Sequence, residues 1–151
     1  MYDLTNYNNF DNIILKNRKS SLKEILELNN ITQNRGLSLT EKQAIELIDN
    51  RDNALKQLGR IELGTGIIAD IIYEFYDSSY IDKDNYLELL LELTEVFYLY
   101  QQEFDNKLTD ERIIKYMKKE FEELAGGSIK LLETTCFDNL RDKILNGDYY
   151  D

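Results

Sequence analysis

The chain contains no proline, and this absence constrains its fold more than any other feature of the sequence. Proline is the residue that most effectively ends or kinks a helix, so a chain without it can form long uninterrupted helices. Apolar residues recur along the chain with the helical period of about 3.6 residues. The seven glycines all fall between these periodic segments, at Gly36, Gly59, Gly64, Gly66, Gly126, Gly127 and Gly147. Because glycine is favoured where helices end, the pattern predicts an all-α fold.

The periodic segments predict a compact single-domain bundle of about six helices over residues 1–151. A short helix is expected over residues 9–17, and the next begins at Ser21–Glu24, which has the pattern of a capping box. A second capping box, Thr40–Gln43, predicts the start of the following helix. The later helices are expected from residue 67, over about 84–104, from 109 to the glycines at 126 and 127, and from 128 with a break near 135–138. The termini, about 1–8 and 147–151, are expected to be loose.

The segment 84–104 is apolar on most of its circumference. Its charged residues form only a narrow acidic stripe, made of Glu88, Glu92, Glu95 and Glu103. A helix that is apolar almost all round is normally buried by its neighbours, so this segment is predicted to be the central helix.

The residue counts exclude several classes of enzyme. The chain has no histidine and one cysteine, Cys136. Without histidine, Ser-His-Asp catalysis, Cys-His catalysis and the common zinc sites cannot be built. A single cysteine excludes intramolecular disulfides, and Cys136 is expected to be a buried small hydrophobe. No cofactor is predicted.

The sequence also bears on location and on partners. It begins without the basic and apolar regions of a signal peptide, and its longest apolar run, residues 96–100, is far shorter than the ~20 residues of a membrane span. A cytoplasmic protein that does not bind membranes is therefore expected. The formal net charge of −11 repels phosphates, so nucleic acid is not expected as a partner.

Most of the net negative charge comes from the middle of the chain, where few basic residues balance the acidic ones. Residues 62–105 contain 11 acidic residues, one Lys and 9 of the 17 aromatic residues. One interpretation is a solvated face that keeps the chain soluble. The functional interpretation is an acidic, Tyr-rich face, with the loop 60–66, that docks a basic protein partner. The chain would then be a non-catalytic protein-interaction module whose candidate binding residues are Arg60, Glu62, Tyr73, Glu88 and Glu92.

Two alternatives remain open. The pairs Glu92 with Glu95 and Glu120 with Glu123 each place two carboxylates on one helix face. If these four residues faced one another, they could hold Mg²⁺, as in all-α nucleotide pyrophosphatase-like hydrolases. The other alternative is a homodimer formed through the helix at 84–104 or the one that begins at 109.

Glycine-rich motifs surround residue 60, but neither of two nucleotide-binding patterns is complete. The segment 59–64 has the glycine spacing of a phosphate loop without its lysine, and the segment 64–69 resembles a dinucleotide fingerprint without the preceding strand. The glycines are instead interpreted as allowing a tight turn before the next helix. Arg60 and Glu62 are expected to form a local ion pair in this loop.

Several segments resemble an uncharacterised helical domain-of-unknown-function family of low-GC bacteria. The resemblance extends over roughly residues 20–145 and is clearest in the Arg-Ile-Glu-Leu-Gly-Thr-Gly-Ile loop that begins at Arg60. The other matching segments are residues 39–41, 84–86, 95–98, 108–110 and 127–128. The resemblance implies a shared helical scaffold and brings no activity, cofactor or catalytic residue.

Overall fold

The computed structural model describes residues 4–147, with the side chains of residues 12–147, and every regular element in this range is a helix. Six helices have nine or more residues: α1 (Leu4–Glu27), α3 (Glu41–Gln57), α4 (Ile67–Phe75), α5 (Tyr86–Phe104), α6 (Asp110–Glu122) and α8 (Phe137–Leu145). The shorter ones are α2 (Asn29–Thr32), the 3-10 helix η1 (Gln33–Arg35), α7 (Ile129–Leu131) and the π-helix η2 (Leu132–Cys136). The prediction of an all-α bundle is confirmed.

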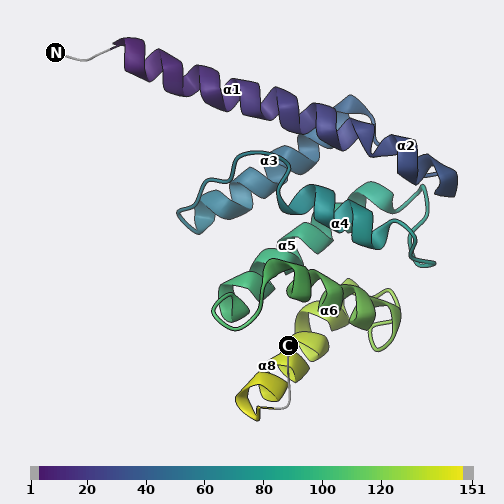
Figure 1. The fold of residues 1–151 in the computed structure, drawn as a ribbon. Helices are drawn as coiled ribbons and strands as arrows, with labels where there is room; N and C mark the ends of the chain where they lie inside the picture. Colours follow the sequence, from purple (N-terminus) through teal and green to yellow (C-terminus); the bar gives the residue numbers. More distant parts are fainter. Residues whose placement is uncertain (1–3, 148–151) are drawn as a thin grey trace.

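The helices form successive layers in chain order (Figure 1). The α1 helix covers α3 and α4, which in turn contact α5, and α5 and α6 contact the C-terminal segment. Eleven of the nineteen residues of α5 are buried, because α3, α4, α6, α7 and η2 all pack against it. The prediction of a central helix at this position is therefore confirmed. Among the described helices, none combines the length and apolar character needed to cross a membrane.

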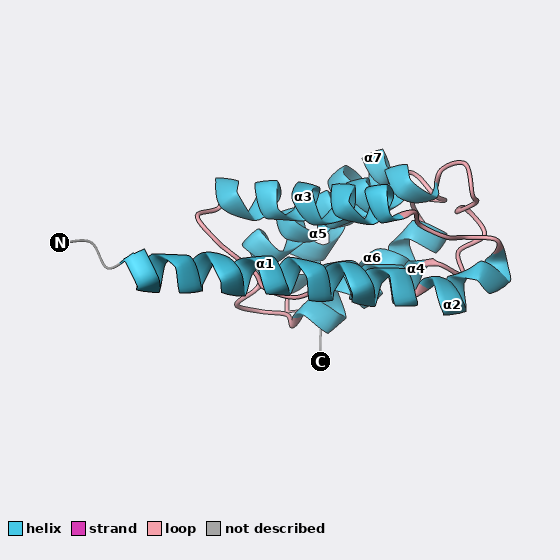
Figure 2. Cartoon of the chain, turned by 90° about the horizontal axis from the view of Figure 1, so that it is seen from above, coloured by secondary structure: helices cyan, strands magenta, loops and turns pink. Residues whose placement is uncertain are grey.

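The first helix differs most from its prediction. The α1 helix runs without interruption from Leu4 to Glu27, and its N-terminal end projects past the other helices (Figure 2). The helix start expected at Ser21 is wrong: the Ser21 hydroxyl donates to the Asn17 carbonyl at 2.7 Å, as a serine inside a helix does. Residues 4–8, expected to be loose, are helical, whereas 1–3 and 148–151 lie outside the described residues.

Two other helix starts are as predicted. Thr40 forms a complete capping box with Gln43, in which each side chain bonds to the other residue's backbone N–H. The Thr109 side chain accepts a hydrogen bond from the Arg112 backbone and begins α6. These caps satisfy N–H groups that the first helical turn leaves without partners.

The helix break expected near residues 135–138 is the π-helix η2, which begins at Leu132 and ends at Cys136. Buried tyrosine hydroxyls bond to its carbonyl groups: Tyr100 donates to Leu132 at 2.6 Å, and Tyr116 donates to Cys136 at 2.8 Å. These bonds stabilise carbonyls in a stretch where the regular helical ladder is interrupted. They also attach the C-terminal segment to α5 and α6, and Cys136 is buried as predicted.

Candidate functional site

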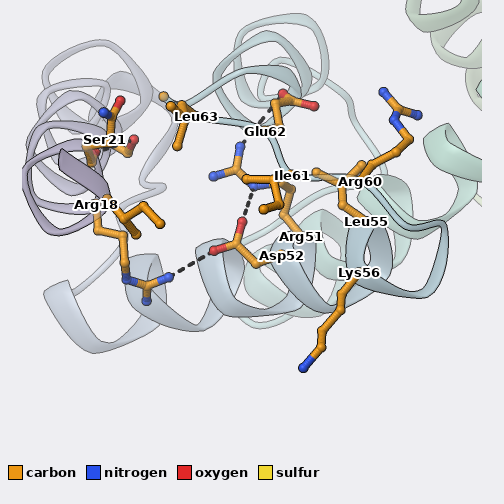
Figure 3. A pocket seen from close by; sticks show the side chains of 13 residues that line it. Arg18, Ser21, Arg51, Asp52, Leu55, Lys56, Arg60, Ile61, Glu62 and Leu63 are labelled. Carbon is orange, nitrogen blue, oxygen red and sulfur yellow. Dashed lines mark hydrogen bonds and ion pairs between the residues drawn. The ribbon is translucent and has the colours of Figure 1, made fainter. Parts of the chain in front are cut away.

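A pocket of about 310 Å³ opens between α1, α3 and the loop 60–66 (Figure 3). Most of the surface that lines it is apolar, and its aliphatic residues are Ile14 of α1, Leu55 of α3, and Ile61 and Leu63 of the loop. Leu55 is buried, whereas Ile61 and Leu63 are 78% and 52% exposed. We call this hollow the basic pocket because four arginine and lysine residues line it.

The lining of the basic pocket has more cations than anions. Its charged residues are the cations Arg18, Arg51, Lys56 and Arg60 and the carboxylates Asp52 and Glu62. The Arg60 guanidinium donates to Gln101 on α5, and Figure 3 shows the charged ends of Lys56 and Arg60 directed away from Arg18 and Ser21. The guanidinium groups that remain beside the apolar surface are those of Arg51 and Arg18, so an anionic ligand of this site would bind to these two groups.

Arg51 is the structural centre of this pocket. The residue is only 2% exposed, and its Nε donates to Asp52 at 2.8 Å. Its Nη1 donates to the Thr65 carbonyl at 3.4 Å and lies 3.7 Å from Glu62. A buried guanidinium needs such partners to offset its lost hydration. Arg51 therefore ties the loop 60–66 to α3.

One nitrogen of Arg51, Nη2, is not used in these contacts. No described residue accepts a hydrogen bond from Nη2, and Figure 3 shows this end of the guanidinium directed away from Asp52 and Glu62, towards Ser21 and Leu63. Arg51 is not among the binding residues predicted from the sequence. Its burial could have been predicted, because Arg51 is the one charged residue in the apolar stripe formed by Leu47, Ile48 and Leu55.

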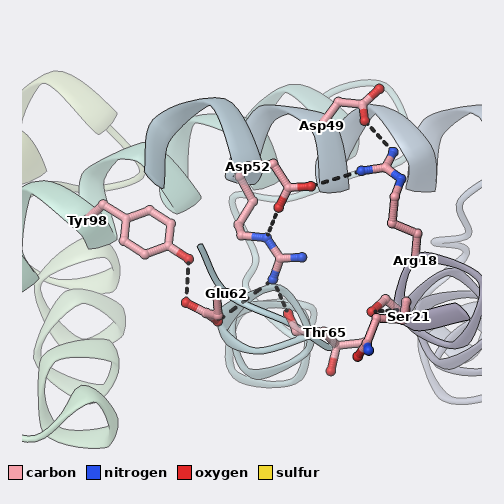
Figure 4. Close-up of polar contacts among 9 residues, drawn as sticks. Arg18, Ser21, Asp49, Asp52, Glu62, Thr65 and Tyr98 are labelled. Carbon is pink, nitrogen blue, oxygen red and sulfur yellow. Dashed lines mark hydrogen bonds and ion pairs between the residues drawn. The ribbon is translucent and has the colours of Figure 1, made fainter. Parts of the chain in front are cut away.

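The first helix joins this network through Arg18. Its Nη1 donates to Asp52 at 2.9 Å, and its Nη2 forms an ion pair with Asp49 (Figure 4). Asp52 thus lies between two guanidinium groups, one from α1 and one from α3. The arrangement holds α1, α3 and the loop in one set of charged contacts.

The expected ion pair between Arg60 and Glu62 is wrong, because each side chain has partners elsewhere. Glu62 pairs with Arg51 and accepts a hydrogen bond from the Tyr98 hydroxyl at 3.3 Å. Burial, followed by the charge of Glu62, raises the pKa of Tyr98, so this phenol remains a neutral donor. These contacts turn Glu62 towards α3 and α5.

Arg60 instead connects the loop to the next layer. Its Nη1 donates to Gln101 at 2.7 Å, and Gln101 Nε2 donates to Asp110 at 2.9 Å. Gln101 is buried on α5, so the loop is bonded through α5 to the first turn of α6.

The tight-turn interpretation of the glycines is supported by Gly66. Its φ of +48° is one that residues with a side chain rarely adopt, and a Cβ there would overlap the Glu62 carboxylate. Gly64 also has a positive φ, but nothing crowds its missing side chain.

A second hollow, of about 470 Å³, lies between α4 and α6 and is called the acidic groove. Its lining residues are Asp70, Tyr73, Glu74, Glu111, Ile114 and Lys115. Burial raises the pKa of Asp70, and the nearby carboxylates Asp110, Glu111 and Glu62 raise it further. The Tyr73 ring is 64% exposed, whereas Ile114 is only 4% exposed.

The structure separates the five predicted binding residues. Arg60 and Glu62 line the basic pocket, and Tyr73 lines the acidic groove. Glu92 lines a third hollow beside α7 and η2; burial, followed by Glu88 and other carboxylates, raises its pKa. The α5 part of the expected Tyr-rich face over residues 62–105 is wrong, because the three tyrosines of α5 lie in the core: Tyr86, Tyr98 and Tyr100.

The four glutamates of the Mg²⁺ alternative do not come together. Among residues 12–147, no three acidic or cysteine side chains are placed so that they could hold a metal ion. Glu120 is almost buried, and its charge, after burial, raises the pKa of Cys136. Glu92 instead interacts with Glu88, Glu95 and Glu133. The spacing of the two pairs placed carboxylates on helix faces, but those faces do not share one site.

Comparison with protein families identifies the scaffold. The model of the family of unknown function DUF6323 matches residues 24–149. The chain belongs to this family. The DUF6323 match confirms the resemblance to a domain of unknown function. It includes the acidic groove and the α3 and loop walls of the basic pocket, whereas Arg18 and Ser21 precede it. Searches among curated proteins and solved structures gave no match.

Proposed function

We propose that this DUF6323 chain is a non-catalytic protein-interaction module that binds a basic segment of another protein along the acidic groove. The observation that carries the proposal is Tyr73, a large aromatic residue that is 64% exposed beside the carboxylates of a concave surface. Exposed aromatic residues at such places commonly supply much of the energy of protein–protein binding.

The charges of the groove favour a basic partner. Three carboxylates line it, and its one cation, Lys115, forms an ion pair with Glu111 at 3.0 Å. The raised pKa of Asp70 results from burial and from repulsion by neighbouring carboxylates, so a lysine or arginine from a partner would relieve that repulsion. The net charge of −11 would also accelerate the approach of a basic partner.

The apolar part of the groove supplies an anchor for the same partner. Tyr73 projects from α4, its ring centroid lies 6.4 Å from that of Tyr76, and Ile114 lies beneath the groove on α6. A partner with an apolar residue beside its cations would bury the Tyr73 ring and leave its hydroxyl at the wet edge.

The test uses a short synthetic peptide of lysine and leucine, with a glutamate–leucine peptide as its control. The variants Glu111→Lys and Glu103→Lys change the net charge equally, but only Glu111 lines the groove. We expect Glu111→Lys to weaken binding of the basic peptide about tenfold, and Glu103→Lys to weaken it much less. Tyr73→Ala should also weaken binding, without unfolding the chain, because the side chain is largely exposed.

Three outcomes would overturn the proposal. Equal losses for the two charge variants would indicate a general attraction to the acidic chain. A loss confined to Glu88→Lys and Glu92→Lys would place the partner along α5, away from the groove. Dissociation of a homodimer by Tyr73→Ala, detected by sedimentation, would make the groove a self-association surface.

A further inference from the structure

We propose that the basic pocket binds a small molecule with an apolar body and a single carboxylate. This site is separate from the acidic groove, and the inference does not depend on the proposed protein partner. It rests on an apolar hollow with the guanidinium groups of Arg51 and Arg18 in its wall, and on the Nη2 of the buried Arg51, which donates to no described residue.

The aliphatic walls would hold the apolar body of the ligand. Leu55 forms part of the interior wall, and Ile61 and Leu63 lie at the mouth with much of their surface in water. A ligand that covered these two loop side chains would remove apolar surface from water, which is favourable at about 25 cal/mol per Å². The exposure of adjacent apolar side chains beside a pocket is typical of ligand-binding surfaces.

Arg51 would hold the head group. Its Nη2 carries two N–H groups that no described residue accepts, on the side facing Ser21 and Leu63 (Figure 3). A carboxylate oxygen there would accept a charge-assisted hydrogen bond from a donor that the fold already holds in place. The guanidinium of Arg18, on the opposite wall, would add to the attraction.

The two carboxylates of the pocket limit the charge of the ligand. Asp52 contacts both guanidinium groups, and Glu62 lies beside Arg51. They would repel a phosphate dianion more strongly than a carboxylate monoanion. The volume of about 310 Å³ is near the lower end of small-molecule sites, so the ligand would be small.

The first experiment titrates the ¹⁵N-labelled full chain with octanoate and, separately, with octanamide. The two molecules have similar apolar bodies, but only octanoate carries a charge. We expect octanoate to shift amide signals of the loop 60–66 and of residues around Arg51, and to bind about tenfold more tightly than octanamide. Equal affinities, or shifts spread over the whole surface, would overturn the proposal.

The second experiment compares two substitutions of equally exposed leucines. Leu63 is 52% exposed at the pocket mouth, and Leu124 is 50% exposed beyond the end of α6. We expect Leu63→Asp to weaken octanoate binding at least about tenfold, because it adds a like charge and removes an apolar contact. Leu124→Asp should leave the affinity unchanged. Equal effects of the two substitutions would show that octanoate does not occupy this pocket.

Discussion

The basic pocket and the acidic groove use charged residues in opposite ways. In the basic pocket, Arg51 is buried and paired, and Asp52 is shared between two guanidinium groups. In the acidic groove, burial and then the nearby carboxylates Asp110, Glu111 and Glu62 raise the pKa of Asp70. The first arrangement stabilises the fold, whereas the second costs stability. A surface that retains such repulsion is more readily explained by binding than by folding.

The largest expected effect tests the stabilising half of this comparison. Arg51→Ala should lower the free energy of unfolding by about 2–3 kcal/mol, because Asp52, Glu62 and the Thr65 carbonyl would lose a buried partner. Urea unfolding followed by circular dichroism measures the change. Arg141→Ala is the control, since the ion pair of Arg141 with Asp138 is exposed and should contribute under about 1 kcal/mol. Similar losses for both variants would contradict the central role of Arg51.

The next effect concerns the loop that carries the pocket wall. Gly66→Ala should cost about 2–3 kcal/mol, because it combines an unfavourable φ of +48° with a clash against Glu62. Gly64 also has a positive φ, of +84°, but nothing crowds a Cβ there, so we expect Gly64→Ala to cost about 1 kcal/mol. Thermal unfolding of the two variants gives the comparison. A Gly64 variant as unstable as the Gly66 variant would show that contact with Glu62 is unimportant.

A smaller effect is expected at Tyr98. Tyr98→Phe removes the hydroxyl that donates to Glu62, while the buried ring remains. We expect a loss of about 1 kcal/mol in urea unfolding. An unchanged or increased stability would indicate that this hydrogen bond does not help to hold Glu62 in the pocket.

The smallest effect tests the acidic groove and has the opposite sign. The pKa of Asp70 is higher in the folded chain than its ordinary value, so the folded state binds protons more readily. As pH rises through that pKa, the ionised Asp70 therefore lowers the free energy of unfolding. Asp70→Asn should stabilise the chain by about 0.3 kcal/mol at pH 7, a small gain because the group is largely exposed. The gain should shrink as pH falls and disappear below about pH 3, where the carboxyl is mostly protonated in both states. Destabilisation at pH 7 would contradict the repulsion.

The parts of the fold that follow from local pattern could be predicted from the sequence. Thr40 and Thr109 begin their helices as expected, and the apolar circumference of α5 predicts its central position. The pattern at Ser21 predicts a helix start that the structure does not contain, because a serine followed three residues later by glutamate also occurs inside helices. There its hydroxyl bonds to the preceding turn.

The site was harder to predict because its contacts join residues far apart in the chain. Arg18, Arg51 and Glu62 meet through the packing of α1 on α3 and the return of the loop, which no local pattern specifies. The number of tyrosines in α5 suggests a docking surface, but their side chains are buried in the core. Tyr73, on α4, is 64% exposed because it lies on the side of its helix that faces water.

The most direct test of the proposed interaction is a titration of the ¹⁵N-labelled chain with the lysine–leucine peptide. We expect amide shifts along α4 and α6 around Tyr73 and Glu111, and no shifts in the loop 60–66. The glutamate–leucine peptide should cause no shifts. Shifts that avoid the acidic groove, or the same response to both peptides, would contradict the proposed interaction.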